Sequence, residues 1–364
     1  MSSATRLYLL CLLFIIGFSK IITAQTDSTA NGGETFTAPL PVVFYTPETN
    51  LGIGAALIRN FYPGAKASPR PSQLQLGGAY TFNKQLLFFF SYQLFLRDGS
   101  REIFGELGYY DYIYFYYGIG NETQQVQEET YAVKFPRFRI NMLEEVFPNF
   151  RAGLSYKFDA YDITGLAESG LLESNQPTGF EGGNISTLGA ILRYDTRDNV
   201  NLPLNGWYVT LTLEQNAKWL GSSFNYSRAL LDVVKYIPVG EKQTIALNTY
   251  TGTMGGQVPF QELLFIGGSR KGRGIIEGRF RDKSLLLFQA AYRFPIFWRI
   301  RGAVFASSGR VGATYGQLWK GTHHLNYGAG LRFLLNEKEQ LQVRFDVGLG
   351  GDGLGYYLFF SDAF

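Results

Sequence analysis

Residues 341–350 read Leu-Gln-Val-Arg-Phe-Asp-Val-Gly-Leu-Gly, and this stretch determines the fold class. Apolar side chains occupy every second position, and Gln342, Arg344 and Asp346 stand between them. A period of two indicates a β-strand with two unlike faces. Sandwich strands rarely place arginine and aspartate in alternate positions. The stretch therefore predicts a wall strand with lipid on one face and water on the other.

The same alternation recurs in two other stretches. In residues 325–333 the apolar positions alternate with Asn326, two glycines and Arg332. In residues 150–159 they alternate with Arg151, Gly153, Ser155, Lys157 and Asp159. Several strands of this kind predict an all-β protein, a transmembrane up-and-down antiparallel β-barrel.

The composition agrees with a barrel in an outer membrane. Charged residues make up 17% and aromatic residues 16% of the chain, with 24 tyrosines and 43 glycines. Soluble domains usually carry about 25% charged residues, and no stretch after the N-terminal segment holds about 18 uninterrupted apolar residues, as a membrane helix would need. Aromatic girdles explain the high share of aromatic residues, and strands with one lipid-facing side explain the low share of charged residues.

Strand candidates of this type number about sixteen, an even number as single-chain barrels require. They lie near 40–46, 51–61, 72–81, 85–96, 101–111, 128–142, 148–162, 185–196, 206–217, 222–237, 242–253, 284–296, 300–313, 325–335, 339–349 and 354–364. Short links such as 240–242 and 336–339 are expected to be periplasmic turns. The longer links 112–127, 163–184, 254–283 and 314–324 are expected to be extracellular loops, alternating with the short ones. A bulge is expected at Pro136, where the apolar phase of its strand shifts.

The chain begins with an export signal. Arg6 precedes the apolar run 7–18, and Ile22-Thr23-Ala24 supplies a small-x-small cleavage site. We expect a signal peptide at 1–24, a flexible lead at 25–39 and the barrel at 40–364. Cys11, the only cysteine, lies in the signal, so the mature chain is expected to have no disulfide.

A glycine- and arginine-rich stretch, residues 267–282, interrupts the alternation. It contains Gly267, Gly268, Arg273, Gly274, Arg279 and Asp282. Such a sequence makes a poor strand and a worse helix, but it can fold tightly and point cations into a polar lumen. We expect this loop to fold into the barrel; a solvated basic loop is the alternative.

Two motifs carry a resemblance to a known family. The strand end with Asp195, Arg197 and Asp198, followed by Pro203 and Gly206, resembles the signature of the BamA superfamily of outer-membrane assembly and secretion barrels, the bacterial surface antigen family. In that family a loop with a Val-Arg-Gly-Phe/Tyr core folds back into the barrel. Gly272-Arg273-Gly274-Ile275 occupies the matching place, with about eleven strands before it and five after, where a sixteen-stranded member carries it.

The C-terminal strand looks like the signal that the cell's barrel-assembly machinery reads. It ends with an aromatic residue and is expected to place four side chains on one face: Tyr356, Leu358, Phe360 and Phe364. The chain departs from the family in lacking room for periplasmic POTRA domains before the first strand, so it resembles the short branch without them.

The usual carboxylate partners of the loop arginine are also missing, because their positions hold Ala291 and Ser307. Asp346, on the polar face of its strand, is the best substitute for them. We expect Arg273 to reach Asp346, with Glu277 and Asp282 pairing Arg279 or Arg281. The alternative is that Asp346 pairs only with the wall arginines Arg332 and Arg344.

The resemblance implies an outer-membrane barrel that assists insertion or translocation of proteins or lipids. Its expected partners are outer-membrane lipid, an unfolded polypeptide substrate and a periplasmic protein replacing the POTRA domains. Such activity needs a weak seam between the first and last strands. Pro41 and Pro47 remove ladder donors, and Gly351, Gly353 and Gly355 lower order before the last strand. The alternative is a passive pore or structural barrel.

Catalysis and metal binding find no support in the sequence. The two histidines, His323 and His324, are adjacent, Ser307-Ser308 has no base nearby in sequence, and no Gly-x-Ser-x-Gly elbow occurs. Neither histidines nor carboxylates show ligand spacing. We expect no enzyme, no cofactor, no metal and no nucleic-acid partner.

Overall fold

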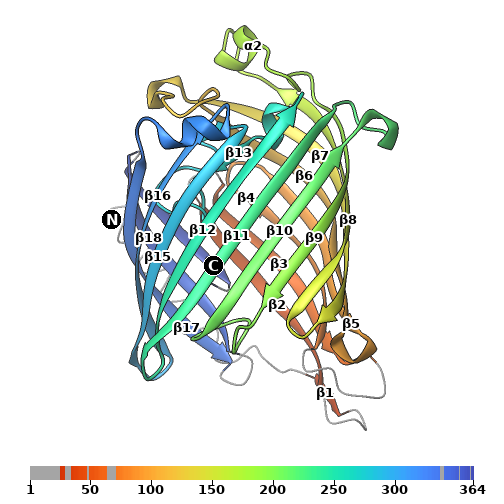
Figure 1. The fold of residues 1–364 in the computed structure, drawn as a ribbon, viewed down its shortest axis with the longest axis vertical. Helices are drawn as coiled ribbons and strands as arrows, with labels where there is room; N and C mark the ends of the chain where they lie inside the picture. The colour runs from red at the N-terminus through yellow and green to blue at the C-terminus, as the bar shows by residue number, and fades with distance from the viewer. Residues whose placement is uncertain are drawn as a thin grey trace.

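A closed antiparallel barrel makes up most of the structure, a computed structural model that describes residues 25–28, 34–46, 49–63, 71–336, 340–351, 353–360 and 362–364 (Figure 1). Sixteen strands form the wall: β2 (Glu34–Thr46), β3 (Asn50–Phe61), β4 (Ser72–Thr81), β5 (Leu86–Leu96), β6 (Arg101–Tyr116), β7 (Glu129–Phe147), β8 (Phe150–Gly165), β9 (Gly183–Asp195), β10 (Gly206–Asn216), β11 (Tyr226–Gly240), β12 (Gln243–Gly256), β15 (Ser284–Phe297), β16 (Ile300–Gly312), β17 (His324–Asn336), β18 (Leu341–Gly350) and β19 (Gly353–Phe360). Each strand pairs with the next, and β19 closes the barrel on β2. The expected fold class is therefore confirmed, with eleven wall strands before the long loop and five after it.

The first strand begins earlier than predicted. Residues 34–39, which we expected in a flexible lead, belong to β2, and β1 (Gln25–Ser28) pairs with residues 34–37 of β2. The expected signal peptide, Pro47 and the link residues 337–339 lie outside the described residues.

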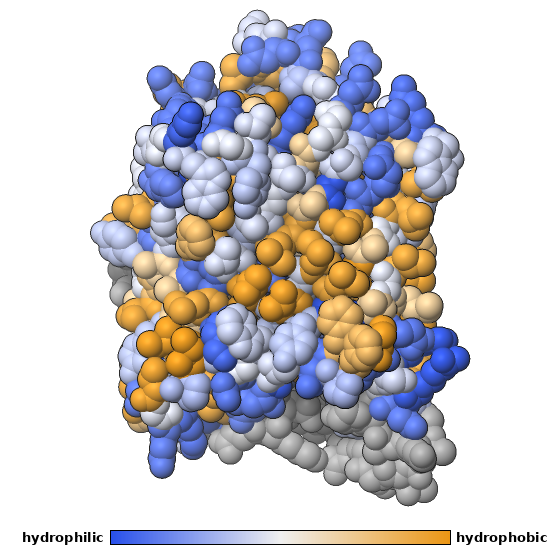
Figure 2. Space-filling model, viewed as in Figure 1, coloured by the Kyte–Doolittle hydropathy of each residue, from blue (hydrophilic) through white to orange (hydrophobic). Residues whose placement is uncertain are grey.

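Alternate residues of each wall strand face lipid, as the sequence predicted. On β17, Leu325, Tyr327 and Leu331 are exposed, whereas Asn326 and Arg332 are buried in the lumen. Orange, apolar residues cover the middle and lower part of the face in Figure 2, and bluer residues gather at both ends. This band matches the hydrocarbon layer of a membrane. None of the helices among the described residues is long and apolar enough to span a membrane.

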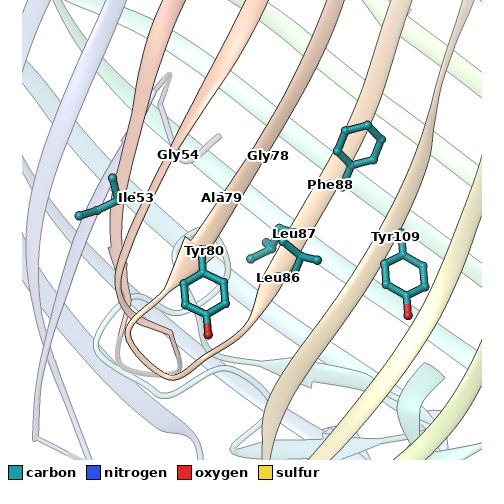
Figure 3. A pocket seen from close by; sticks show the side chains of 9 residues that line it. All are labelled: Ile53, Gly54, Gly78, Ala79, Tyr80, Leu86, Leu87, Phe88 and Tyr109. Carbon is teal, nitrogen blue, oxygen red and sulfur yellow. The ribbon is translucent and has the colours of Figure 1, made fainter.

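A shallow depression of about 490 Å³ marks the outer wall over β3 to β6 (Figure 3). Gly78 forms part of its lining, where the missing side chain leaves room between Ile53 and Phe88. Tyr80 and Tyr109 point their hydroxyl groups the same way, toward the turn that joins β4 to β5. They are placed as interfacial aromatic residues are, with an apolar ring in lipid and a polar tip near water.

The bulge predicted at Pro136 is wrong. The pairing of β6 with β7 runs through Pro136 without a shift, and the β7–β8 register is the same on both sides of it. The shift in apolar phase has another cause: Tyr131, Val133 and Phe135 are buried in the lumen. The sequence argument assumed a polar lumen, whereas this part of it contains a hydrophobic core.

Long and short links alternate less strictly than expected. The strand directions place the short β2–β3, β4–β5 and β18–β19 links at the same end as the long loops. Phe61 at the end of β3 and Ser72 at the start of β4 lie at the opposite end, with the ten-residue link 196–205 and the link 241–242. Strand direction, rather than link length, therefore identifies the two ends.

Candidate functional site: the lumenal loop and the seam

The loop 257–283 folds into the barrel and fills the lumen at the loop end. Inside it, β13 (Leu264–Ile266) pairs with β14 (Phe280–Asp282), a small sheet that the sequence did not predict. Its apolar side chains form one buried cluster with residues of the wall, including Phe260, Leu263, Ile266, Ile275, Phe280, Tyr131, Val133, Phe135, Leu285 and Leu287. The loop is therefore held first by burial of apolar surface.

Two glycines turn the chain at the tip of this loop. Gly267 and Gly268 have φ angles of 121° and 89°, a region that favours glycine. The N–H of Gly267 donates to the Lys271 carbonyl at 2.6 Å, and the N–H of Gly268 donates to the Ile275 carbonyl at 2.9 Å. A Cβ on Gly267 would lie 2.0 Å from the Ile276 carbonyl oxygen, so a larger residue does not fit. This turn directs Arg273 toward β18.

Arg273 forms an ion pair with Asp346 on the lumenal face of β18. The guanidinium Nη1 lies 2.6 Å from Oδ2 of Asp346, and the two side chains are 2% and 0% exposed. Arg332 contacts the other carboxylate oxygen at 2.6 Å, and Arg344 also pairs with Asp346. The loop arginine and the two wall arginines therefore share one carboxylate, so Asp346 does not pair with the wall arginines alone.

The Arg273 side chain is enclosed by an aromatic ring and by the carboxylate of Asp346. Its guanidinium carbon lies 3.5 Å from the centroid of the Phe305 ring, within cation–π distance. Burial lowers the pKa of Arg273 to about 10, with Asp346 acting in the opposite direction. The side chain is still charged at neutral pH, and removal of Asp346 would leave a buried cation without its counter-ion.

The loop backbone is held by Asn326, Ser307 and Tyr357, for which the sequence predicted no such role. The Asn326 amide donates to the Arg273 carbonyl at 2.6 Å, and Ser307 donates to the Asn326 side chain at 2.5 Å. The N–H of Gly274 donates to the Tyr357 hydroxyl at 3.0 Å. Ser307 therefore reaches the loop through a neutral chain of hydrogen bonds that ends on the carbonyl oxygen of Arg273.

Close approach of the loop requires glycine on β18. A Cβ on Gly348 would lie 2.7 Å from the carbonyl carbon of Arg273 and from the nitrogen of Gly274. A Cβ on Gly350 would lie 2.5 Å from the Gly274 carbonyl oxygen, and Gly274 itself has a φ of 104°. Asp346, Gly348 and Gly350 thus form one inward-facing strip that supplies both the counter-ion and the space for the loop.

A second buried anchor, Glu262, ties the loop to the opposite part of the wall. Its carboxylate accepts from Lys157 at 2.6 Å, Tyr161 at 3.1 Å and Tyr226 at 3.3 Å, and Arg228 lies 3.7 Å away. Burial raises the pKa of Glu262, but Lys157 and Arg228 outweigh this effect and hold it well below the usual range. A carboxylate within an apolar run, Val-Pro-Phe-Gln-Glu-Leu-Leu, was the signal that could have identified this anchor.

Arg279 and Arg281 of the loop contact different parts of the structure: Arg279 the loop 117–128, and Arg281 its own loop and the end of β6. Arg279 donates to the Thr123 hydroxyl at 2.6 Å and to its carbonyl at 2.8 Å. Arg281 donates to the carbonyls of Gly278 and Phe115, each at 3.0 Å. Asp282 accepts from the N–H of Lys283 at 2.8 Å. The pairing of Glu277 or Asp282 with these arginines remains a prediction.

The strand-end signature organises the link 196–205. Arg197 binds Asp195 through two contacts of 2.9 Å each. Asp198 accepts from three backbone N–H groups, those of Asn199, Leu204 and Asn205, while Pro203 is buried. Gly206 has a φ of 112°, and a Cβ there would lie 2.2 Å from the Thr196 carbonyl oxygen. These residues shape the connection between β9 and β10 and make no contact with Arg273 among the described interactions.

The C-terminal residues do not share one face. Tyr356 and Leu358 alternate with the buried Tyr357 and face outward, and Phe360 belongs to β19 by its backbone. Phe364 instead turns into the lumen, where it packs against Val234, Tyr236 and Ala246. The expected single face is therefore wrong for Phe364, because the strand ends at residue 360 and the alternation ends with it.

The seam between the first and last strands is weak. Among the described residues, β19 and β2 share one residue pair, Leu358 with Tyr45. By contrast, β18 and β19 pair continuously from Val343 with Phe360 to Gly350 with Gly353. The described part of β2 from Glu34 to Phe44 has β3 as its wall partner, and β1 pairs with its first residues. One edge of β2 is therefore largely without a wall strand beside it.

The two histidines have separate surroundings. The His324 ring stacks on Phe280 at 3.5 Å between centroids, and its Nε2 lies 2.9 Å from the Asn121 carbonyl oxygen. His323 lies 3.2 Å from the Ser308 hydroxyl at an exposed position. Within the described ranges no group of three or more potential ligands could hold a metal ion.

A closed transmembrane barrel whose lumen holds a loop anchored to its own wall defines a class of bacterial outer-membrane protein. The Omp85 superfamily domain matches residues 72–350. The chain belongs to the Omp85 superfamily and is an outer-membrane protein, as the BamA-like motifs predicted.

Solved structures of the same fold are distant in sequence. The BamA structure from Haemophilus ducreyi that lacks POTRA domains 1–3 is 15% identical, with a TM-score of 0.60 over 99% of this chain and 78% of that one. CdiB from Acinetobacter baumannii and CdiB from Escherichia coli are 12% and 11% identical, with TM-scores of 0.55 and 0.62. This chain is covered to 92% and 93%, and those chains to 65% and 67%. No curated protein gives a significant sequence match.

Proposed function

We propose that this barrel assists the insertion or translocation of polypeptides, or of lipids, at the outer membrane. The observation that carries the proposal is the seam, where one residue pair joins β19 to β2 among the described residues. An extended substrate segment can add to a free strand edge through main-chain hydrogen bonds. The edge of β2 offers backbone groups for such bonds, although Pro39 and Pro41 carry no N–H donor.

In the proposed activity, the lumenal loop couples the wall of the barrel to the seam. It is anchored on β18 through Arg273 and on β8 and β11 through Glu262, so it spans the lumen. The Arg273 anchor also contacts Tyr357 of β19, the last strand, through Gly274. The loop therefore contacts a strand of the seam directly, and movement of β19 would disturb the docked loop.

A passive pore is the alternative function, and the filled lumen disfavours it. Sixteen-stranded porins leave an aqueous channel, but here a buried apolar cluster of loop and wall residues fills the loop end. A periplasmic protein that delivers substrate belongs to the proposal, in the role that POTRA domains have in the resembling family. The barrel-assembly machinery is the expected partner for its own insertion.

The test uses the protein reconstituted in liposomes. We would measure the insertion rate of a small urea-unfolded barrel, with an unrelated porin of similar size as the control. We expect faster insertion than with the porin, and loss of the acceleration in Arg273→Met. Equal rates together with steady ion conductance would favour the passive pore and refute the proposal.

A further inference from the structure

The last residues of the chain leave the barrel wall and cross the lumen. The Asp362 side chain is 7% exposed, and its carboxylate lies 3.2 Å from Arg293 of β15 and 3.2 Å from Arg332 of β17. Gln342 of β18 donates to the same carboxylate at 3.2 Å. Asp362 thus contacts three strands that precede β19 in the sheet.

Phe364 continues this path to more distant strands. Its ring packs against Val234 and Tyr236 of β11 and Ala246 of β12, and Arg293 donates to its carbonyl oxygen. The Arg293 guanidinium lies 5.6 Å from both the Phe364 and the Tyr236 ring centroids. In Figure 1 the C mark lies within the outline of the barrel, near the β11 label.

The wall residues around this segment match its chemistry: buried arginines face the Asp362 carboxylate, and apolar residues of β11 and β12 face the Phe364 ring. Arg293 and Arg332 are each 2% exposed, and the nearby Arg273 and Arg344 add further positive charge. Withdrawal of Asp362 would take this carboxylate from the buried Arg293, which is strongly unfavourable, while Arg332 would keep Asp346. The segment 362–364 is therefore held firmly, although it belongs to no strand.

We propose that residues 362–364 act as a lumenal tether that holds β19 in the closed barrel in place of strand pairing with β2. The tether attaches the last strand to β11, β12, β15 and β17, whereas the seam supplies one residue pair. Release of the tether frees the end of β19 and opens the seam. The proposal rests on the role of the seam in the proposed function and names the contact that keeps it closed.

Arg332 connects this tether to the loop anchor. It bridges Asp346 at 2.6 Å and Asp362 at 3.2 Å, so one guanidinium serves both carboxylates. Arg273 also lies 6.0 Å from the Phe364 ring. Undocking of the loop therefore weakens the tether, and release of the tether weakens the loop anchor.

The experiment measures the seam directly, by pulsed electron–electron distances between spin labels in the full chain. Labels at Ile53→Cys on β3 and Tyr356→Cys on β19 report the separation across β2. We expect a single narrow distance in the wild-type background and a second, longer population in Asp362→Asn. The shift should be about 5 Å or more, since adjacent strands lie about 4.8 Å apart.

Two further variants make the result decisive. Phe364→Ala removes the packing but keeps the charges, and we expect it to add the same longer population. Glu144→Gln removes a half-exposed ion pair with Arg101 on β6 and β7, and we expect the narrow wild-type distance. Only variants with wild-type heat-modifiable migration are compared. Wild-type distances in both Asp362→Asn and Phe364→Ala would overturn the tether. The insertion assay is not involved, so the tether and the proposed function can fail separately.

Discussion

The guanidinium of Arg273 contacts the carboxylate of Asp346 at 2.6 Å, although the two residues are 73 positions apart in the chain. Asp346 takes the place of the carboxylates that Ala291 and Ser307 do not supply. It also holds Arg332 and Arg344, so three cations depend on one acidic side chain. Breaking a buried pair by removing one partner typically costs about 3–5 kcal/mol.

Arg273→Met should release the loop tip from β18. The change keeps an apolar stem, and Asp346 keeps its two wall arginines, so no buried charge is left unpaired. We therefore expect docking to weaken by about 1.5–3 kcal/mol, the contribution of a hydrogen bond to a charged group. A spin label at Ser269→Cys reports the mobility of the loop tip, and Cys11 is the only other cysteine of the chain. Lys218→Ala, an exposed change in a neighbouring loop, should leave the label immobile. An immobile label in Arg273→Met would contradict the anchor.

Glu262→Gln should release the opposite side of the loop. Lys157 would then lie buried without its ion pair to Glu262, whereas Arg228 would keep Glu214, and the cost should be about 3 kcal/mol. Tyr226→Phe removes one 3.3 Å hydrogen bond and should cost about 1 kcal/mol. We expect single-channel recordings to show larger conductance for Glu262→Gln than for Tyr226→Phe. Equal conductance would show that Glu262 does not hold the plug.

Gly348→Ala should displace the loop by steric conflict alone. The new Cβ would lie 2.7 Å from backbone atoms of Arg273 and Gly274, which cannot move as a flexible side chain would. We expect increased mobility of the Ser269 label, with the charge of the site unchanged. Gly351→Ala is the matched control, because no atom lies within 4 Å of a Cβ built there. The same label mobility in both variants would argue against close packing on β18.

Docking of the loop should strengthen as pH rises from about 7 to about 10.5. Burial lowers the pKa of Lys271 to about 7, with Asp232 opposing, from an ordinary value of 10.5. Between these values the released loop binds more protons than the docked loop, so deprotonation favours docking. Lys271→Met should remove this dependence, as measured by the Ser269 label over the same pH range. An unchanged pH profile in Lys271→Met would assign the dependence to another group.

The wall strands could be predicted because lipid and water impose opposite demands on alternate residues. The β18 stretch shows both faces plainly, and Asp346 as the partner of Arg273 followed from its inward position. The interior of the loop end could not be predicted in this way. Tyr131, Val133 and Phe135 face inward against the loop, and a single-sequence pattern gives no indication that an apolar residue of a barrel strand contacts another loop instead of lipid.

The contacts of Phe364, Glu262 and Asn326 were missed for a different reason. Periodicity predicts the face of a residue only while the strand continues, and Phe364 lies beyond β19. Glu262 and Asn326 act through partners far away in sequence, which no local pattern specifies. Their positions follow from the closed sheet, in which β8, β11 and β18 surround the same lumen.

The position of Asp346 on the next-to-last wall strand also sets an order of events. The loop that carries Arg273 is synthesised before β15 to β19, and its counter-ion, its space beside Gly348 and its Tyr357 contact arrive last. Such long-range contacts form late, because the intervening chain must first be ordered. A one-residue slip of β18 would turn Asp346 toward lipid. Docking of the loop is thus a check that the final strands have been added in the correct register.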